Sequence, residues 1–153
     1  MNLYELAIEE FMYDPEEGIV RRKKDGHIGW DNGRGYLFHK FRGKSIMSHR
    51  LAWLIVNGEF PTGIIDHING DKRYNRISNL RIATYQQNNA NRKGWRKSAS
   101  GLKGVSPKNG KWIAQIMVNR KGINLGCFQS KEDAHAAYMR AAIIYFGEFA
   151  RAD

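Results

Sequence analysis

Short apolar runs separated by turn residues divide the first half of the chain into small elements. The turn Asp14-Pro15-Glu16-Glu17-Gly18 indicates a hairpin around it, and a second hairpin is expected around Arg42-Gly43-Lys44. In order, the predicted elements are a helical segment over residues 3–10, strands at 11–13 and 19–22, an irregular Gly-rich stretch at 23–35, and strands at 36–41 and 45–47.

An amphipathic helix is predicted over residues 49–57, with Ser48 as its N-cap and Gly58 just past its end. The residues of its apolar face are Leu51, Ala52, Leu54 and Ile55. His49 begins this helix and is interpreted as a capping or packing residue. His39 has no partner in the sequence and is interpreted as a surface residue.

The stretch from Ile64 to Asn91 has a different character, because amide side chains recur through it. It predicts a strand–loop–strand–helix unit. Its parts are a strand at 63–66, a polar loop at 68–78, a strand at 79–83, and a helix at about 85–92 capped by Thr84.

The remainder predicts three short strands and one helix, at 103–106, 111–118, 122–128 and 131–146. Ser130 opens the helix and Gly147 ends it. The residues expected on one face of the helix are Ala134, Ala137, Tyr138, Ala141 and Ile144. Alternation along the second strand turns Trp112, Ala114, Ile116 and Val118 toward this helix, which leaves Lys111, Ile113, Gln115 and Met117 outside.

The charge of the chain indicates which classes of partner it binds. The 153 residues include 25 Lys and Arg against 15 Asp and Glu, and no acidic residue lies between Lys93 and Lys131. This excess favours a polyanion as partner, with nucleic acid first and an anionic membrane surface second. The sequence has no apolar run of the roughly 20 residues that span a bilayer and no secretory signal. A single cysteine, Cys127, excludes an internal disulfide and a CxxC zinc pair. A cytoplasmic location is expected.

Asp66 and His67, at the end of a short apolar run, have the residue types that metal-assisted phosphodiester hydrolysis needs. A carboxylate from Asp66 and an amide oxygen from the following helix suit Mg²⁺, which retains several waters and takes further ligands from phosphate. His67 is mostly neutral at pH 7 and can accept a proton from water.

Several motifs of the central stretch occur together in a fixed order. They are His49-Arg50-Leu51-Ala52-Trp53, Asp66-His67-Ile68-Asn69-Gly70-Asp71-Lys72, Asn75-Arg76, Asn79-Leu80-Arg81 and Asn88-Asn89-Ala90-Asn91. Over residues 10–92 the chain resembles the HNH homing endonucleases of phages, with their ββα-metal (His-Me finger) site. The sequence departs from that family at Tyr74, where the family usually has Asp.

The resemblance implies His67 as general base, Asp66 and Asn88 as metal ligands, and Asn79 as a brace for the histidine loop. Asn89 or Asn91 remains an alternative to Asn88. Arg76 is a candidate catalytic residue that either contacts phosphate or is solvated, and the same two alternatives stand for Arg81.

Residues 100–150 resemble the plant APETALA-two/ethylene-response-factor DNA-binding domain. The motifs are Ser100-Gly101-Leu102-Lys103-Gly104-Val105, Lys111-Trp112-Ile113-Ala114-Gln115-Ile116, Leu125-Gly126-Cys127-Phe128 and the segment from Glu132 to Ala142. The resemblance implies an α+β fold in which a three-stranded antiparallel sheet, packed on one helix, reads DNA. The candidate DNA-binding residues are Lys103, Ser106, Lys108, Lys111, Gln115, Met117, Arg120, Lys121 and Asn124.

Together these features predict a nuclease domain at 1–92, a basic linker at 93–99 and a DNA-binding domain at 100–153. The expected function is that of a homing-type endonuclease that uses Mg²⁺ or Mn²⁺, without zinc, and nicks double-stranded DNA as a monomer without a protein partner. The alternatives are a DNA-binding regulator with an inactive nuclease module and an RNA-binding protein.

Overall fold

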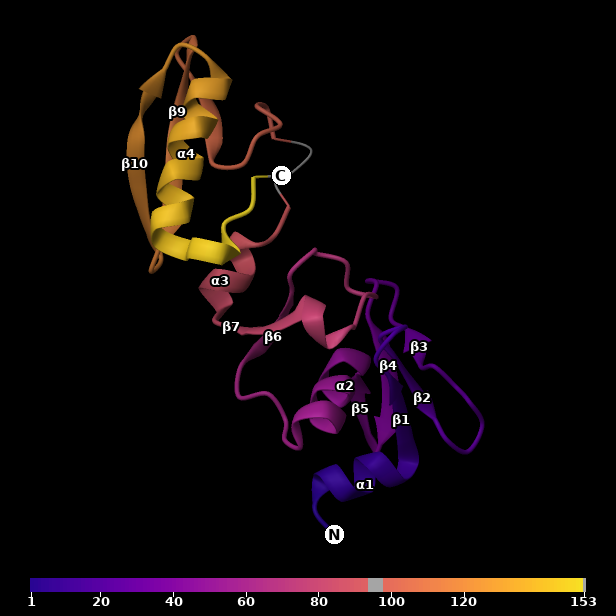
Figure 1. Ribbon diagram of the computed structural model, residues 1–153. Coiled ribbons are helices and arrows are strands. Elements are labelled where there is room, and N and C mark those ends of the chain that lie inside the picture. The colour runs from indigo at the N-terminus through magenta and orange to yellow at the C-terminus, as the bar shows by residue number, and fades with distance from the viewer. Residues whose placement is uncertain (94–97, 153) are drawn as a thin grey trace. The chain divides into compact units, whose positions relative to one another are not determined.

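The computed structural model describes residues 1–93 and 98–152 (Figure 1). Contacts divide the chain into two compact units, Met1–Ala83 and Thr84–Asp153. Helices and small antiparallel sheets occur in both, which confirms the predicted α+β class. The domain boundaries expected at 92 and 100 stay predictions, and residues 94–97 of the predicted linker lie outside the described residues.

The first unit is built from two α-helices and short strands. Its elements are α1 (Leu3–Glu10), β1 (Phe11–Asp14), β2 (Ile19–Arg22), β3 (Trp30–Asp31), β4 (Leu37–Phe41), β5 (Lys44–Met47), α2 (Ser48–Asn57), β6 (Ile64–His67), the 3-10 helix η1 (Ile77–Asn79) and β7 (Leu80–Ala83). The sheets are β1-β2, β3-β4-β5 and β6-β7. Both predicted hairpins are confirmed. β3 was not expected, because two residues among glycines show no alternation.

The core of this unit lies where α1 and α2 meet the N-terminal strands. Its buried residues are Ala7, Phe11, Val20, Phe41, Leu51, Ala52 and Leu54. The predicted capping of α2 is wrong by one residue, since Met47 is the N-cap and Ser48 is the first helical residue. Gly58, at φ +80°, ends the helix as expected and donates its N–H to the Leu54 carbonyl.

His39 belongs to this core, so the prediction that it lies on the surface is wrong. Its side chain is fully buried, and its ring meets the Phe11 ring edge-on with centroids 5.3 Å apart. Alternation along β4 puts His39 on the same face as buried Phe41. Burial lowers the pKa of His39 to about 4, so the ring is neutral at pH 7 and packs as an apolar group.

The turn between β1 and β2 packs tightly on the loop that leads into η1. Gly18 has φ +70°, and a Cβ atom at this position would lie 2.5 Å from the backbone nitrogen of Arg76. Only glycine allows both this conformation and this approach. The N-terminal hairpin therefore supports the segment that follows the candidate catalytic strand.

The second unit packs one long helix on a three-stranded sheet (Figure 1). Its elements are α3 (Tyr85–Ala90), β8 (Val105–Lys108), β9 (Lys111–Val118), β10 (Lys121–Phe128), α4 (Lys131–Phe146) and the 3-10 helix η2 (Gly147–Phe149). The antiparallel order β10-β9-β8 matches the expectation. Thr84 caps α3 through a capping box with Gln87, and Ser130 caps α4.

The inner face of this sheet is the one predicted. Ala114 and Ile116 of β9 are buried beneath α4, while Gln115 and Met117 are exposed. One helix position was assigned wrongly, because Ile144 is 79% exposed. The buried positions of α4 are Ala134, Tyr138, Ala141, Ala142 and Phe146, a face that has turned away from Ile144 by the last helical turn.

No helix in residues 1–93 or 98–152 has the length and apolar character that a membrane crossing requires.

Candidate active site

Asp66 and His67 end β6, which pairs antiparallel with β7. Asp66 is 4% exposed and His67 is 5% exposed. Arg81, opposite Asp66 in the ladder, donates from Nε to Asp66 Oδ2 at 2.9 Å. Because both side chains are shielded from water, their Coulomb attraction is screened less than that of a surface pair. Arg81, whose role the sequence left open, is thus a direct partner of the candidate metal ligand.

Asn79 ties together the loop that follows His67. Its Nδ2 donates to Asn69 Oδ1 at 2.9 Å and to the Tyr74 carbonyl at 2.7 Å, and its Oδ1 accepts from the Asn69 N–H at 3.0 Å. Its backbone carbonyl accepts from the N–H of Ile68. These contacts are in line with a bracing role for Asn79, which stays a prediction.

The contacts of His67 include a buried amide and two rings. Its Nε2 lies 2.8 Å from Asn75 Oδ1. The His49 ring is 5.2 Å away and nearly perpendicular, and the Tyr36 ring is 6.4 Å away. His49 is buried, in agreement with the packing alternative.

The two histidines are both neutral at pH 7. Burial lowers the pKa of His49 to about 3. Burial also lowers the pKa of His67, although the hydrogen bond with Asn75 and the carboxylate of Asp66 oppose this shift. A neutral His67 imidazole is the form that can accept a proton.

Tyr13 is a part of the site that sequence reasoning missed. Its hydroxyl donates to the Asn75 carbonyl at 3.0 Å and accepts from the Ile77 N–H at 3.2 Å. Burial raises the pKa of Tyr13, so the phenol stays protonated and can make both bonds. Only the tertiary fold brings β1 to this loop, so the local sequence pattern contained no signal for the contact.

Arg76 is half-buried and stacks on Tyr74, with its guanidinium carbon 5.2 Å from the ring centroid. Tyr74, the departure noted in the sequence, thus supplies an aromatic face for Arg76.

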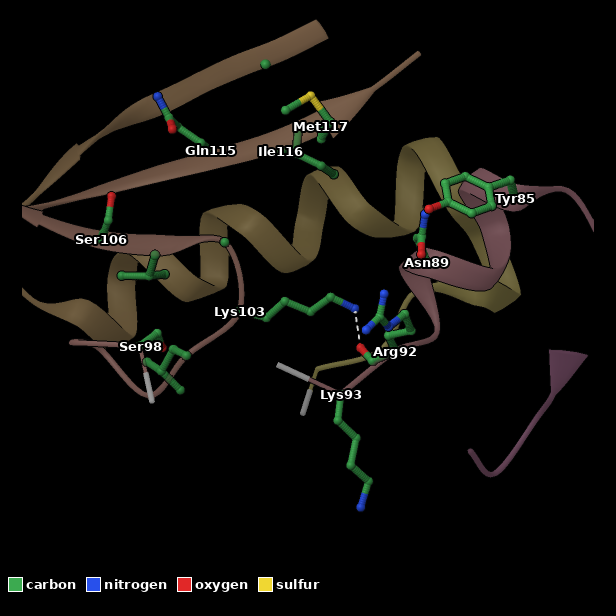
Figure 2. Close-up of a pocket in the computed structure, with 14 residues that line it drawn as sticks. Tyr85, Asn89, Arg92, Lys93, Ser98, Lys103, Ser106, Gln115, Ile116 and Met117 are labelled. Carbon is green, nitrogen blue, oxygen red and sulfur yellow. Dashed lines mark hydrogen bonds between the residues drawn. The ribbon is translucent and has the colours of Figure 1, made fainter. Parts of the chain in front are cut away.

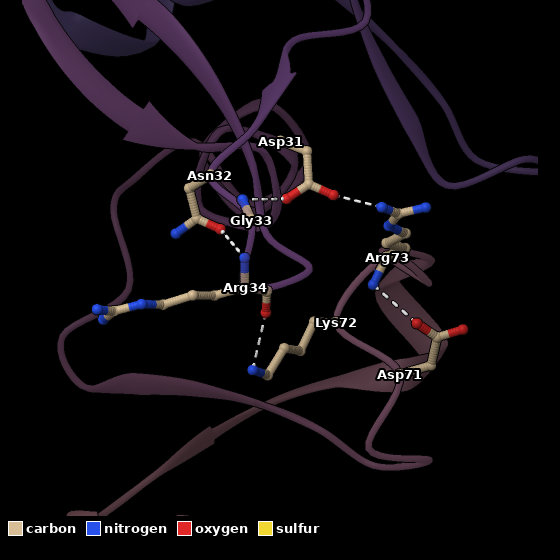
Figure 3. A network of polar contacts seen from close by, with 7 residues as sticks. All are labelled: Asp31, Asn32, Gly33, Arg34, Asp71, Lys72 and Arg73. Carbon is tan, nitrogen blue, oxygen red and sulfur yellow. Dashed lines mark hydrogen bonds and ion pairs between the residues drawn. The ribbon is translucent and has the colours of Figure 1, made fainter.

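A Gly-rich loop that was expected to be irregular packs against the histidine loop (Figure 3). Arg73 forms an ion pair with Asp31, and Lys72 Nζ donates to the Arg34 carbonyl at 3.0 Å. The same ammonium lies 4.6 Å from the centroid of the Tyr36 ring, which also packs on His67. Of these side chains, the exposed Lys72 is the one that contacts a ring packed on the candidate base.

Comparison with known proteins identifies the family to which the residues of this site belong. Residues 47–90, which include β6, its loop, β7 and α3, match the family model described as HNH endonuclease. Protein 3.8 of Escherichia phage T7 is 32% identical over 113 residues, which cover 71% of this chain and 91% of the phage protein. The chain belongs to the HNH endonuclease family. A mimivirus protein of Acanthamoeba polyphaga, named as an uncharacterized HNH endonuclease, is 34% identical over 123 residues, which cover 79% of this chain. The chain spans 64% of that viral protein.

The HNH motif extends across the boundary between the two units. Asp66 belongs to the first unit, whereas Asn88 lies on α3 in the second. Their joint role as metal ligands stays a prediction. Among the described residues, no three His, Cys, Asp or Glu side chains form a metal-binding group.

The residues predicted to contact DNA lie mainly on the outer face and hairpin ends of the second unit. On neighbouring strands, Gln115 lies opposite Asn124 and Lys108 opposite Lys111. The exposed members of the predicted set are Ser106, Lys108, Lys111, Gln115, Met117, Arg120, Lys121 and Asn124. Their DNA contacts, and the APETALA-two assignment, stay predictions.

Lys103 differs from the rest of this set. Its ammonium donates to the Ala90 carbonyl and, at 2.7 Å, to the Arg92 carbonyl. These carbonyls lie at the end of α3, where helical partners are lacking. Lys103 thus links the HNH helix α3 to the segment that precedes β8, a position that spacing alone does not reveal.

A cleft of about 600 Å³ lies beside this link (Figure 2). Arg92, Lys93 and Lys103 supply its cations, while Gln115 and Met117 bring the outer sheet face to its edge. The exposed sheet residues and the cations after α3 therefore form one continuous surface of the second unit.

Proposed function

We propose that the protein is a homing-type HNH endonuclease that hydrolyses phosphodiester bonds of double-stranded DNA and nicks one strand. The observation that carries this proposal is the placement of His67 at the end of β6, beside Asp66, in a loop braced by Asn79. Because the chain belongs to the HNH endonuclease family, we interpret this geometry as a site for phosphodiester hydrolysis.

In the proposed reaction, His67 accepts a proton from the attacking water, which approaches phosphorus in line with the leaving 3′ oxygen. The products are a 3′-hydroxyl and a 5′-phosphate. Asn79 keeps the loop in place, and Arg76, held against Tyr74, contacts a substrate phosphate. Removal of a positioned general base generally costs about 10²- to 10⁴-fold in rate.

The donor set suits a small hard cation. Asp66 Oδ2 is occupied by Arg81, but an ionised carboxylate offers about four acceptor positions on two oxygens, so the ion pair still leaves capacity for metal binding. Asp66 and Asn88 would hold Mg²⁺, or Mn²⁺ in its place, and the bound ion would supply positive charge to the phosphate and the leaving oxygen.

The direction of the side chains on α3 supports Asn88, rather than Asn89, as the metal ligand. Asn89 lines the basic cleft, whereas Asn88 does not (Figure 2). Successive helical residues point about 100° apart, so a helix that turns Asn89 toward the sheet directs Asn88 elsewhere.

We further propose that the second unit binds the duplex through the outer face of its sheet, as a β-ribbon does in a major groove. The exposed cations at its hairpin ends, such as Lys108, Lys111, Arg120 and Lys121, contact phosphates. Binding that depends on phosphate contacts weakens steeply as salt rises.

A plasmid assay tests the function. Supercoiled DNA is incubated with the full chain and Mg²⁺, Mn²⁺ or a chelator, and the nicked and linear products are separated. We expect nicked circles with Mg²⁺, none with the chelator, and a loss of at least about 100-fold in His67→Ala. His27→Ala, at an exposed histidine outside the site, should retain activity.

Two results would overturn the proposal. One is intact DNA with every divalent ion tried, and the other is undiminished cleavage by His67→Ala. Tight duplex binding without cleavage would instead support the regulator alternative. Linear product at the earliest times would refute nicking alone.

A further inference from the structure

Two clefts adjoin along α3 of the second unit, with volumes of about 600 and 910 Å³. The larger cleft lies where α3 meets the end of β9 and the second half of α4. The residues that line both clefts are Tyr85, Asn89, Lys103, Ile116 and Met117. The two clefts are therefore parts of one groove, which we call the α3 groove.

The walls of the α3 groove are joined at both ends of α3. Near the start of the helix, Gln86 Oε1 accepts a hydrogen bond of 3.0 Å from the Asn119 N–H, in the turn between β9 and β10. At its end, the Lys103 ammonium donates to the carbonyls of Ala90 and Arg92. Because α3 is fixed at two points, the groove is formed before any ligand binds.

The charge of the α3 groove has one sign. Its cations are Lys103, Arg92, Lys93 and Arg120. Among the described residues that line it, none is Asp or Glu. A concave surface with this charge concentrates anions such as phosphate groups. The groove also continues from the proposed DNA-binding face, since Met117 and Arg120 belong to both.

Exposed aromatic rings distinguish the α3 groove from a simple phosphate site. Tyr85, at the start of α3, is 72% exposed, and Tyr145, on α4, is 48% exposed. Each ring has a flat face on which an unpaired base can stack. Asn89 lies one helical turn after Tyr85 on the same side of α3 and can form hydrogen bonds with the edge of such a base (Figure 2).

These features fit a single strand rather than a duplex. In a duplex the bases stack on one another and present only their edges to a protein. Their faces become available to tyrosine rings when the strand is unpaired. Proteins bind single strands by combining cations that follow the backbone with aromatic side chains that stack on the bases.

We propose that the α3 groove binds single-stranded DNA, with bases stacked on Tyr85 and Tyr145 and phosphates beside Arg92 and Arg120. This site is distinct from the outer sheet face that is proposed to bind the duplex. In the proposed reaction its ligand is a strand released at a nick, but the binding itself does not depend on cleavage.

Fluorescence anisotropy of a labelled oligothymidylate, which forms no duplex, tests the site in the full chain. The buffer contains EDTA, so that no metal-dependent cleavage occurs. We expect binding that Tyr85→Ala and Tyr145→Ala each weaken by about 5- to 150-fold, the range for the loss of one base–aromatic stack. Tyr85→Phe keeps the ring and should bind as the wild type does. Ile144→Ala is the matched control, because Ile144 is exposed beside Tyr145 but lines neither cleft.

A labelled blunt duplex is the second probe, and its affinity should not change in Tyr85→Ala. Equal losses for duplex and single strand in this variant would overturn the inference. So would the absence of oligothymidylate binding, or binding that neither alanine variant weakens. Tighter binding of oligouridylate would overturn DNA as the ligand. A dimer of the chain that Tyr85→Ala dissociates, without oligothymidylate binding, would assign the groove to a second copy instead.

Salt dependence tests the phosphate contacts. Arg92→Gln should reduce the slope of the logarithm of the binding constant against the logarithm of salt concentration by about 0.7, the general value for one phosphate of a single strand. Unchanged slopes in both Arg92→Gln and Arg120→Gln would exclude the groove as the path of the phosphates.

The two proposals fail separately. A protein that nicks plasmid but binds no oligothymidylate refutes the single-strand site and leaves the nuclease proposal standing. A protein that binds oligothymidylate through Tyr85 but cleaves no DNA does the reverse.

Discussion

Replacing His39 by leucine should reduce the loss of unfolding free energy that the first unit suffers in acid. The His39 ring is fully buried against Phe11, and among the described residues neither of its nitrogens has a hydrogen-bond partner. Leucine has a similar volume and no polar atom. Near pH 8 the variant should be at least as stable as the wild type, since a buried unsatisfied polar group costs about 1–3 kcal/mol.

The size of the pH effect follows from the shift in the His39 pKa, from 6.5 in the unfolded chain to about 4 in the folded unit. The unfolded state binds the proton first as pH falls, so the free energy of unfolding decreases through this window and is unaffected well above 6.5. At about 1.4 kcal/mol per pKa unit, His39 should cost about 2 kcal/mol at pH 5 and about 3 kcal/mol below pH 4.

Urea unfolding of the full chain at pH 8 and pH 5, followed through amide signals of β1 and β4, measures this difference. The wild type should lose about 2 kcal/mol more than His39→Leu between these pH values. Phe41→Leu is the matched control on the same strand face, because it should lower stability equally at both pH values. Equal losses in wild type and His39→Leu would refute the reasoning.

Two further predictions concern the second unit. Gly104→Ala should destabilise the protein about 1–3 kcal/mol more than Gly101→Ala in thermal unfolding. Both glycines have φ near +70°, but a Cβ at Gly104 would lie 2.0 Å from the Tyr138 ring, while nothing lies within 4 Å at Gly101; equal effects would contradict this. Lys103→Met should speed hydrogen exchange of the α3 amides by removing the ammonium from the carbonyls at its end. Lys108→Met, at an exposed lysine, should not, and matching rates in the two variants would exclude the link.

Local patterns predicted most of the elements because their signals are local. α4 begins and ends where Ser130 and Gly147 indicated, and Thr84 caps α3 as expected. β9 alternates as its apolar residues required. Each of these features depends on side chains within a few positions of one another, so the sequence pattern is sufficient.

The surroundings of His67 could not be predicted in the same way. Asn75 reaches it through a loop, while Tyr13 comes from a strand near the N-terminus. His39 was misassigned because the sequence does not distinguish a histidine that is neutral and buried in an apolar core from one that is solvated. Ile144 was misassigned because α4 is apolar on more than one side. Asp66 and His67 themselves were evident from residue type, but their supporting contacts arise only in the fold.

Several hydrogen bonds that hold the loop after the candidate base come from groups without net charge. Asn69, Asn75, Asn79 and Tyr13 make these contacts through amides, a phenol and the backbone. Ionic strength barely affects such bonds, whereas it governs contacts between lysine or arginine and phosphate. Salt should therefore control how often the protein occupies DNA while leaving the turnover of each bound complex nearly constant. Affinity and catalytic rate could then change independently, one through surface cations and the other through neutral hydrogen bonds.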